Sequence, residues 1–249
     1  MKIVRLNNAE KFNNNTLNFL GNGSCFNTAF GNNSAYHIDK EKQSLLLIDC
    51  GESIFERIIK QKILEGIRDI NILITHMHTD HVGSLPSLLF FCQYVKGIIP
   101  TVIYPEKDIM NQYLSLVGNE PQAYRLITPK ECEEYRIQEV KQEHSEFINA
   151  YGYILELEGR SIYYSGDTKT ISKLVMEAFR AGNLDEFYQD VSRYDTPAHM
   201  NIETLSRLFT KDERSKITCM HFDDDITRNK SECLGFNISR VNEYRNLER

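Results

Sequence analysis

Short apolar runs, rich in branched and aromatic residues, recur along the chain and end at polar or glycine-containing turns. Runs of this length predict buried strands, at residues 16–20, 44–48, 70–75, 101–104, 151–157, 161–164 and 216–220. Between them, apolar residues spaced three and four apart predict helices at residues 53–64, 85–95, 109–117, 172–181 and 202–209. Strands and helices alternate without a repeat, linker or charge block. We therefore predict one α/β domain over residues 1–249.

Composition narrows the class of protein. A chain of 249 residues that is 41% hydrophobic and 26% charged can bury an ordinary core, which excludes a disordered or fibrous protein. The 29 Lys and Arg against 35 Asp and Glu give a net charge of -6, which does not favour binding to a polyphosphate such as nucleic acid. A small anionic substrate stays compatible if a metal supplies local positive charge.

Cysteine use and hydropathy predict a cytoplasmic protein. The six cysteines form no C-x-x-C pair, which is typical of reduced, buried thiols: Cys25, Cys50, Cys92, Cys132, Cys219 and Cys233. Residues 1–20 lack the apolar core of a secretory signal. No apolar run approaches the roughly 20 residues that span a bilayer, so we expect no contact with a membrane.

The strongest chemical signal follows the predicted strand at 70–75. His76, His78, Asp80 and His81 place four metal-capable side chains within six residues. In an extended chain His76 and His78 point the same way and can close on one ion, and Asp80 and His81, past the bend, can reach a second. A solvated surface cluster is the alternative. It is disfavoured because desolvating imidazoles beside an apolar strand is costly without a ligand.

Further ligands are available near other strand ends. His144 precedes the strand at 151–157, Asp167 leaves the strand at 161–164 through a glycine, and His221 follows the strand at 216–220. Taken singly, each of the two histidines can be an ordinary polar residue. Together with the first cluster, the set predicts a two-metal site.

This order of residues resembles the metallo-β-lactamase superfamily, whose pattern is a His-x-His-x-Asp-His block followed by a His, an Asp and a last His. The resemblance implies an αββα sandwich with a binuclear metal site at one edge. It also implies that three histidines hold one ion, that a second set holds the other, and that one aspartate bridges them: His76, His78 and His144; Asp80, His81 and His221; and Asp167. By the same resemblance, Asp49 orients a ligand histidine.

Two adjacent ions lower the pKa of a shared water, so we expect hydrolysis. The ligands carry no thiolate, which favours Zn²⁺ and leaves Mn²⁺ and Fe²⁺ open. The substrate is a separate question, because one metal core on this fold serves lactams, thioesters, lactones and phosphodiesters.

His199 stands 221 minus 199, or 22, positions before the last expected ligand and is not needed to hold metal. It resembles the histidine that protonates the departing oxygen in RNase Z-like phosphodiesterases. A phosphodiester needs such an acid, because an alkoxide leaves badly. The alternative is a surface histidine at a helix N-terminus. We expect His199 and Asp80 to be required for catalysis.

The interval between His144 and Asp167 is 167 minus 144, or 23, positions. The extended arm of tRNA-maturing RNase Z-like enzymes does not fit there, which argues against tRNA. The opening stretch at 21–36 resembles phage anti-Pycsar proteins, compact phosphodiesterases that linearise 3′,5′-cyclic mononucleotides such as cyclic CMP and cyclic UMP. A related compact cyclic phosphodiesterase carries a cysteine-rich zinc loop that Cys25 alone cannot supply.

The anti-Pycsar resemblance implies hydrolysis to nucleoside 5′-monophosphates, a homodimer, and action in the host cytoplasm if the gene is phage-borne. Tyr113 or Tyr124 can stack on a base, although ordinary packing is the simpler interpretation. We interpret the run Asp223–Asp225 as a solvated turn and residues 226–249 as a partly helical, polar ending. Three alternatives stay open: a lactone, thioester or β-lactam hydrolase, an armless ribonuclease, and a protein that binds a nucleotide without cleaving it.

Overall fold

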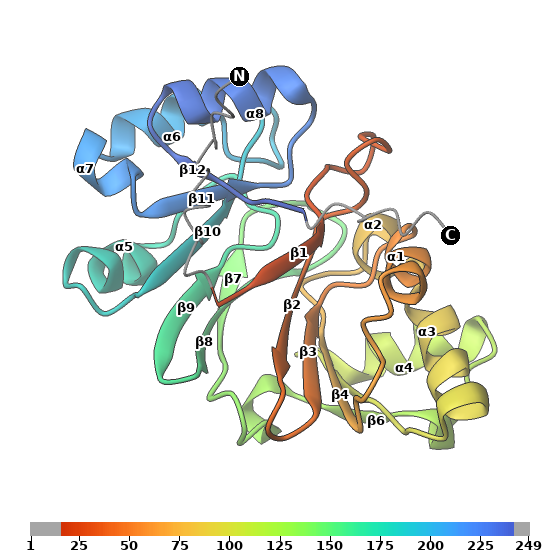
Figure 1. The fold of residues 1–249 in the computed structure, drawn as a ribbon. Helices are drawn as coiled ribbons and strands as arrows, with labels where there is room; N and C mark the ends of the chain where they lie inside the picture. Colours follow the sequence, from red (N-terminus) through yellow and green to blue (C-terminus); the bar gives the residue numbers. More distant parts are fainter. Residues whose placement is uncertain (1–15, 242–249) are drawn as a thin grey trace, which may run out of the picture.

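The computed structural model describes residues 16–241, so most of the stretch at 1–20 and the end of the tail lie outside the described residues. Two six-stranded sheets face each other (Figure 1). The first has, in spatial order, β1 (Asn18–Gly21), β2 (Ser34–Asp39), β3 (Ser44–Ile48), β4 (Asp69–Leu73), β5 (Thr101–Ile103) and β6 (Arg125–Ile127). The second has β12 (Asn237–Ile238), β11 (Ile217–Met220), β10 (Glu186–Asp190), β9 (Arg160–Tyr164), β8 (Ala150–Leu157) and β7 (Gln138–Gln142).

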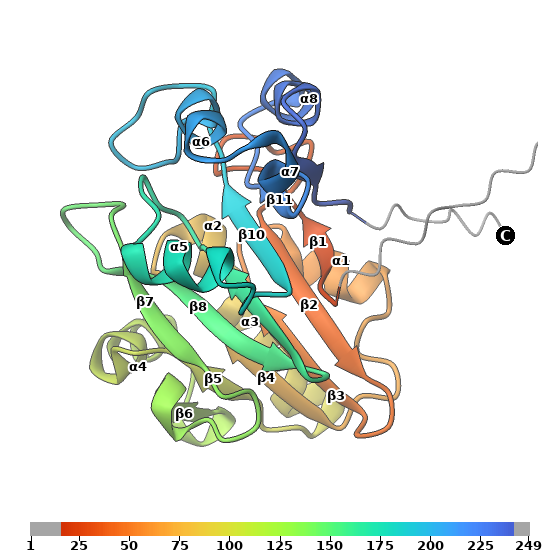
Figure 2. The same cartoon turned by 90° about the vertical axis from the view of Figure 1, so that its left-hand side faces the viewer.

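Helices cover the outer faces of both sheets (Figure 2). Those beside the first sheet are α1 (Ile54–Lys60), α2 (Thr79–Val82), α3 (Leu85–Phe91), which continues into a π-helical turn (Cys92–Lys96), and α4 (Lys107–Leu116). Those beside the second are α5 (Lys173–Arg180), α6 (Ile202–Leu208), α7 (Lys211–Arg214) and α8 (Asp225–Cys233). Short 3₁₀ turns lie at Pro121–Ala123 and Pro129–Glu131. The predicted α/β class and the αββα sandwich are confirmed.

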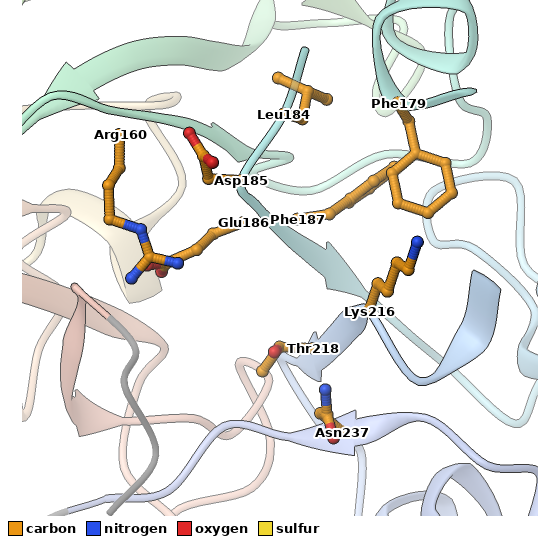
Figure 3. Close-up of a pocket in the computed structure, with 9 residues that line it drawn as sticks. All are labelled: Arg160, Phe179, Leu184, Asp185, Glu186, Phe187, Lys216, Thr218 and Asn237. Carbon is orange, nitrogen blue, oxygen red and sulfur yellow. The ribbon is translucent and has the colours of Figure 1, made fainter. Parts of the chain in front are cut away.

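Each sheet is antiparallel in one half and parallel in the other. Strands β3 to β6 run parallel, as do β9 to β12, so their carboxyl ends gather at one edge of the sandwich. The opposite edge carries a small hollow of about 190 Å³, where β9, β10 and β11 begin (Figure 3). There Arg160 contacts Glu186 at 2.8 Å, and Glu186 accepts hydrogen bonds from Thr16. These contacts hold the residues that precede β1 against strand β10.

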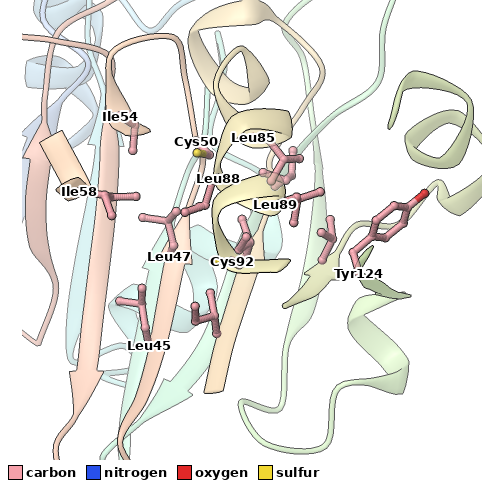
Figure 4. Close-up of a cluster of buried hydrophobic side chains, with 14 of the residues drawn as sticks. Leu45, Leu47, Cys50, Ile54, Ile58, Leu85, Leu88, Leu89, Cys92 and Tyr124 are labelled. Carbon is pink, nitrogen blue, oxygen red and sulfur yellow. The ribbon is translucent and has the colours of Figure 1, made fainter. Parts of the chain in front are cut away.

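Strand β3 shows how the layers are built. Its side chains alternate, so Leu45 and Leu47 pack against the outer helices while Leu46 and Ile48 pack between the sheets. Figure 4 shows the outer layer, in which α1 and α3 lie over Leu45 and Leu47. A strand buried on both faces is apolar throughout, which explains why its sequence was recognisable.

Five strands, β2, β6, β7, β10 and β12, were not predicted. Strand β10 is the instructive case, because it is fully buried although its sequence is Glu-Phe-Tyr-Gln-Asp. Its polar side chains have tertiary partners: Glu186 binds Thr16, far away in the sequence, and Asp190 contacts His199 in the loop that follows the strand. Hydrophobic patterning cannot detect a strand whose polar groups are satisfied by tertiary contacts.

All six cysteines are free thiols. Four are buried, Cys25 is half-buried and Cys233 is exposed, in line with the predicted packing role for most of them. Within residues 16–241, no helix has both the length and the hydrophobicity to cross a membrane.

Candidate metal centre

A cavity of about 780 Å³ opens at the edge where the parallel strands end, a volume in the range of small-molecule sites. Six of the seven histidines of the chain gather at or beside it, and only His37, on β2, lies elsewhere. The cavity is lined by Ser24, Cys25, Phe26, Met77, His78, Thr79, Asp80, His144, Asp167, Tyr194, Thr196, Ala198, His199, His221, Asp223 and Asp224.

His76, His78 and His144 form the first group of potential ligands. The Nδ1 of His78 lies 3.0 Å from the Nε2 of His76 and 3.0 Å from the Nε2 of His144. His76 and His78 follow β4, and His144 follows β7, so the group joins the two sheets. Three imidazole nitrogens converging in this way can share one ion.

Asp80, His81, Asp167 and His221 form the second group, and all four are buried. The Nε2 of His81 lies 3.3 Å from the Asp80 Oδ2 and 3.4 Å from the Asp167 Oδ2. The Nε2 of His221 lies 3.4 Å and 3.3 Å from the same two oxygens. Bonds of about 2.0–2.1 Å in a tetrahedron place the ligand atoms about 3.3–3.4 Å apart, so these four distances fit a single tetrahedrally coordinated divalent cation.

Asp167 belongs to the second group and also approaches the first. Its Oδ2 lies 3.8 Å from the His76 Nε2 and 3.9 Å from the His144 Nε2, in addition to its contacts with the second group. Gly166 makes this placement feasible, because a Cβ there would lie 2.7 Å from the Tyr151 carbonyl oxygen. The glycine therefore lets the chain bring Asp167 close to both groups of potential ligands.

The residues present fit two divalent cations. In the described part of the chain, the Nε2 of His81 and the Oδ1 of Asp167 are buried and lack a hydrogen-bond partner. Burial by itself would lower the pKa of His81 and raise the pKa of Asp167, because it disfavours the charged form of each. The charges of neighbouring residues outweigh burial in both cases. The Asp167 and Asp80 carboxylates raise the pKa of His81 well above its usual range, and His221 and His81 hold the pKa of Asp167 well below its own. The centre thus favours positive charge beside these carboxylates.

Asp49 holds His81 from behind. Its Oδ2 lies 2.8 Å from the His81 Nδ1, and its Oδ1 accepts a hydrogen bond of 2.8 Å from the Thr75 backbone N–H. The Thr75 hydroxyl donates to Asp49 and lies 3.0 Å from the Nδ1 of His76. A proton on each Nδ1 leaves the Nε2 lone pair facing the metal position. The predicted orienting role of Asp49 has the required geometry.

His144 is oriented in the same manner by the loop between β10 and α6. Its Nδ1 lies 2.9 Å from the carbonyl oxygen of Ala198, so Nδ1–H donates and Nε2 faces the first group. His221 leaves β11 with a backbone φ of 60°, a left-handed conformation that is uncommon for histidine. Local backbone geometry, as well as hydrogen bonding, therefore sets the ligand directions.

His199 lies beside the two groups. Its ring stacks on His221 at a centroid distance of 5.0 Å, and its Nδ1 lies 2.9 Å from the Oδ2 of buried Asp190. Burial disfavours the imidazolium, but the hydrogen bond with Asp190 and the charge of Asp167 prevail and raise the pKa of His199 to about 9. The ring is therefore not a free surface histidine, and it can carry a proton at neutral pH.

The structure agrees with the simpler interpretation of Tyr113 and Tyr124, ordinary packing, and agrees only in part with the interpretation of the acidic run. Tyr113 donates to the Val82 carbonyl oxygen, and Tyr124 donates to Asn111, so both belong to the outer core layer and neither lines the cavity. The interpretation of Asp223–Asp225 as a solvated turn is wrong for its first two residues. Asp223 accepts from Ser192, Arg193 and Thr227, and Asp224 caps α8 and pairs with Arg193.

Sequence reasoning also missed Asp190, Phe26 and Tyr194. Asp190 is the last residue of β10, and Asp49 similarly follows Ile48, the last residue of β3. Asp190 was missed because β10 was not predicted as a strand. Phe26 lies within the stretch at 21–36, but no role was predicted for it, and Tyr194 belongs to no motif. Only the folded structure brings them to the cavity.

Comparison with known proteins places the chain in a family. The family model for the anti-Pycsar protein Apyc1 matches residues 15–240. A curated Apyc1 protein of Bacillus phage 010DV004 is 23% identical over 239 residues, which covers 84% of this chain and 90% of that protein.

Solved structures show the same fold. The metallo-β-lactamase-fold protein YhfI of Bacillus subtilis superimposes with a TM-score of 0.70 at 16% identity, covering 91% of this chain and 97% of YhfI. The short form of human tRNase Z superimposes with a TM-score of 0.63 at 18% identity, covering 90% and 96%. Because the family match spans nearly all of the described residues, this metallo-β-lactamase-fold chain belongs to the anti-Pycsar protein Apyc1 family.

Proposed function

We propose that the protein is a binuclear metal-dependent phosphodiesterase that hydrolyses 3′,5′-cyclic mononucleotides, among them cyclic CMP and cyclic UMP, to nucleoside 5′-monophosphates. Membership in a family named for opposing Pycsar supports a role against cyclic-nucleotide antiviral signalling. The observation that carries the chemistry is the position of His199, whose Nδ1 lies 2.9 Å from the Asp190 Oδ2 beside the two groups of potential ligands and whose raised pKa favours the protonated ring.

The charges of the cavity support the need for metal. Four aspartates line it: Asp80, Asp167, Asp223 and Asp224. They would repel an anionic phosphodiester in the absence of cations. Two bound divalent ions, which we propose to be Zn²⁺, would reverse this charge, lower the pKa of a water and stabilise the phosphoryl oxygens. His76, His78 and His144 would hold one ion, Asp80, His81 and His221 the other, and Asp167 would bridge.

His199 serves the departing oxygen. Hydrolysis forms a bond from the water oxygen to phosphorus and breaks the bond from phosphorus to O3′. The ribose alkoxide then needs a proton, and the His199 imidazolium can supply it. Asp190 positions the ring through Nδ1, so that Nε2 is the nitrogen that transfers the proton. The attacking water releases one proton to solvent, and the neutral His199 takes a proton back from solvent, which regenerates the imidazolium.

The short segment between His144 and Asp167 supports a small substrate. Strands β8 and β9 form a tight hairpin across Glu158 and Gly159, which have φ angles of 51° and 75°. The segment between His144 and Asp167 therefore contains no arm of the kind that binds tRNA. With the net charge of -6, this supports a cyclic mononucleotide over a folded RNA.

The test is chromatography of cyclic CMP, UMP, AMP and GMP after incubation with the metal-loaded protein. We expect conversion to 5′-monophosphates, which His199→Ala and Asp80→Ala suppress. His37→Gln is the matched control, because His37 is the one histidine remote from the cavity. Intact nucleotides recovered from a protein that holds two ions per chain would refute the proposal. Lactones, thioesters and precursor tRNA would then be tested as substrates, together with nucleotide binding without cleavage.

We also propose a homodimer that acts in the host cytoplasm when the gene is phage-borne. Exposed apolar side chains on the outer helical layer of the first sheet support an interface there: Tyr94, Val95, Ile99, Leu116 and Val117. Light scattering of the purified protein measures the mass in solution. A mass of one chain at micromolar concentration would contradict the dimer.

A further inference from the structure

Two exposed aromatic side chains line the metal cavity and have no role in the chemistry described above. Phe26 is 94% exposed and Tyr194 is 49% exposed. An apolar ring left in water gains free energy when a ligand covers it. The question is whether the structure holds these rings for such a ligand.

The loop that carries Phe26 is fastened to the metal centre. It connects β1 to β2, and the Ser24 backbone N–H donates to the Phe222 carbonyl oxygen at 3.0 Å. The Asn27 side chain donates to the same oxygen at 3.0 Å. Phe222 directly follows His221, so these bonds on either side of Phe26 hold the loop that carries its ring beside the metal centre.

Tyr194 is also anchored to the turn that follows His221. The Arg193 guanidinium lies 4.2 Å from the centre of the Tyr194 ring and covers one of its faces. Arg193 is itself anchored to Asp224 at 2.9 Å, and the Tyr194 backbone N–H donates to Ser192. The residues after His221 thus anchor both aromatic loops. The run Asp223–Asp225 therefore has a structural role.

We infer that Phe26 and Tyr194 form the nucleobase subsite of the cavity, with the base stacked on their rings while the phosphate lies at the metal centre. This inference rests on the proposed function, because it takes the substrate to be a nucleotide. Every base has a π-face, so stacking binds bases with little regard to their identity. The subsite therefore predicts a broad base profile.

Phe147 offers a matched control. It is also 94% exposed and lies three residues after His144, but it does not line the cavity. Phe147→Ala removes the same surface as Phe26→Ala without touching the proposed subsite. Because both rings are almost fully exposed, we expect both variants to fold.

The experiment measures binding of cytidine 5′-monophosphate and ribose 5-phosphate to the metal-loaded protein by calorimetry. The two probes share the phosphate and the ribose but differ in the base. We expect cytidine 5′-monophosphate to bind more tightly, and Tyr194→Ala or Phe26→Ala to reduce this preference by about 5- to 150-fold each, from the free energy of base stacking. Tyr194→Phe, which keeps the ring, should retain most of the preference, and Phe147→Ala should change it by less than about twofold.

Equal affinity for the two probes, or binding of neither, would overturn the inference. An equal loss in Phe147→Ala would do so as well. Failure of the proposed function has a separate signature. If the protein cleaves no cyclic nucleotide but still prefers the base-bearing probe, the subsite stands and the phosphodiesterase does not.

Discussion

Replacing Asp49 by asparagine should damage the metal centre although the two side chains have the same shape. Asp49 is fully buried and accepts from two fixed directions, the Thr75 backbone N–H at 2.8 Å and the His81 Nδ1 at 2.8 Å. A carboxylate accepts with both oxygens, whereas an amide accepts with one oxygen and donates with its nitrogen. The variant cannot satisfy both partners while His81 keeps its proton on Nδ1.

The backbone N–H of Thr75 cannot change its role, so the amide oxygen of the substituted side chain must face it. The amide NH₂ then faces His81 and favours the tautomer with its proton on Nε2, the atom needed to bind metal. The other amide orientation leaves a buried N–H unpaired, at about 1–3 kcal/mol. Either way, affinity at the second position should fall by about 5- to 150-fold.

The assay is titration of the metal-free variant with Zn²⁺ by calorimetry, together with metal content after gel filtration. We expect one tight ion per chain in Asp49→Asn and two in the native protein. Ser161→Ala, remote from the centre at the start of β9, serves as the control. Two tight ions in Asp49→Asn, with affinities within about threefold of the native protein, would refute the tautomer argument.

Three further predictions concern pH, metal removal and the core. The acid form of His199 is active, so kcat should fall as pH rises through the pKa of His199, which lies at or below about 9 because bound cations lower it. Asp190→Asn should move this fall in kcat to lower pH. A fall at the same pH in the pH profile of the variant would contradict the role of Asp190. Chelation should lower Tm by about 5 to 10 °C, reversed by one equivalent of Zn²⁺ per position, because buried ligands lose their cations; calorimetric scans with no shift would argue against buried metal. Leu47→Ala, at a fully buried position of β3, should reduce the free energy of unfolding by about 2–5 kcal/mol in urea titration, whereas a loss below about 1 kcal/mol would contradict the packing described.

The sequence by itself determined the fold class and the candidate ligands. Strand β3 is apolar because both its faces are buried, and the His76–His81 block follows an apolar strand, so local patterning was enough to recognise them. Ligand chemistry depends on residue type and spacing, which a chain displays directly. Hydrogen bonding through Asp49 to His81 matched the resemblance as well.

Tertiary structure decided the rest. Strand β10 was hidden because its polar residues are paired by tertiary contacts, such as that of Glu186 with Thr16. Asp190, which contacts His199, was missed with it. Phe26 and Tyr194 lie 168 positions apart, the difference of 194 and 26, yet they meet the same cavity, because both loops are bound to the turn after His221. Contacts between distant segments leave no local periodicity in a sequence, and only the packing of the two sheets brings them together.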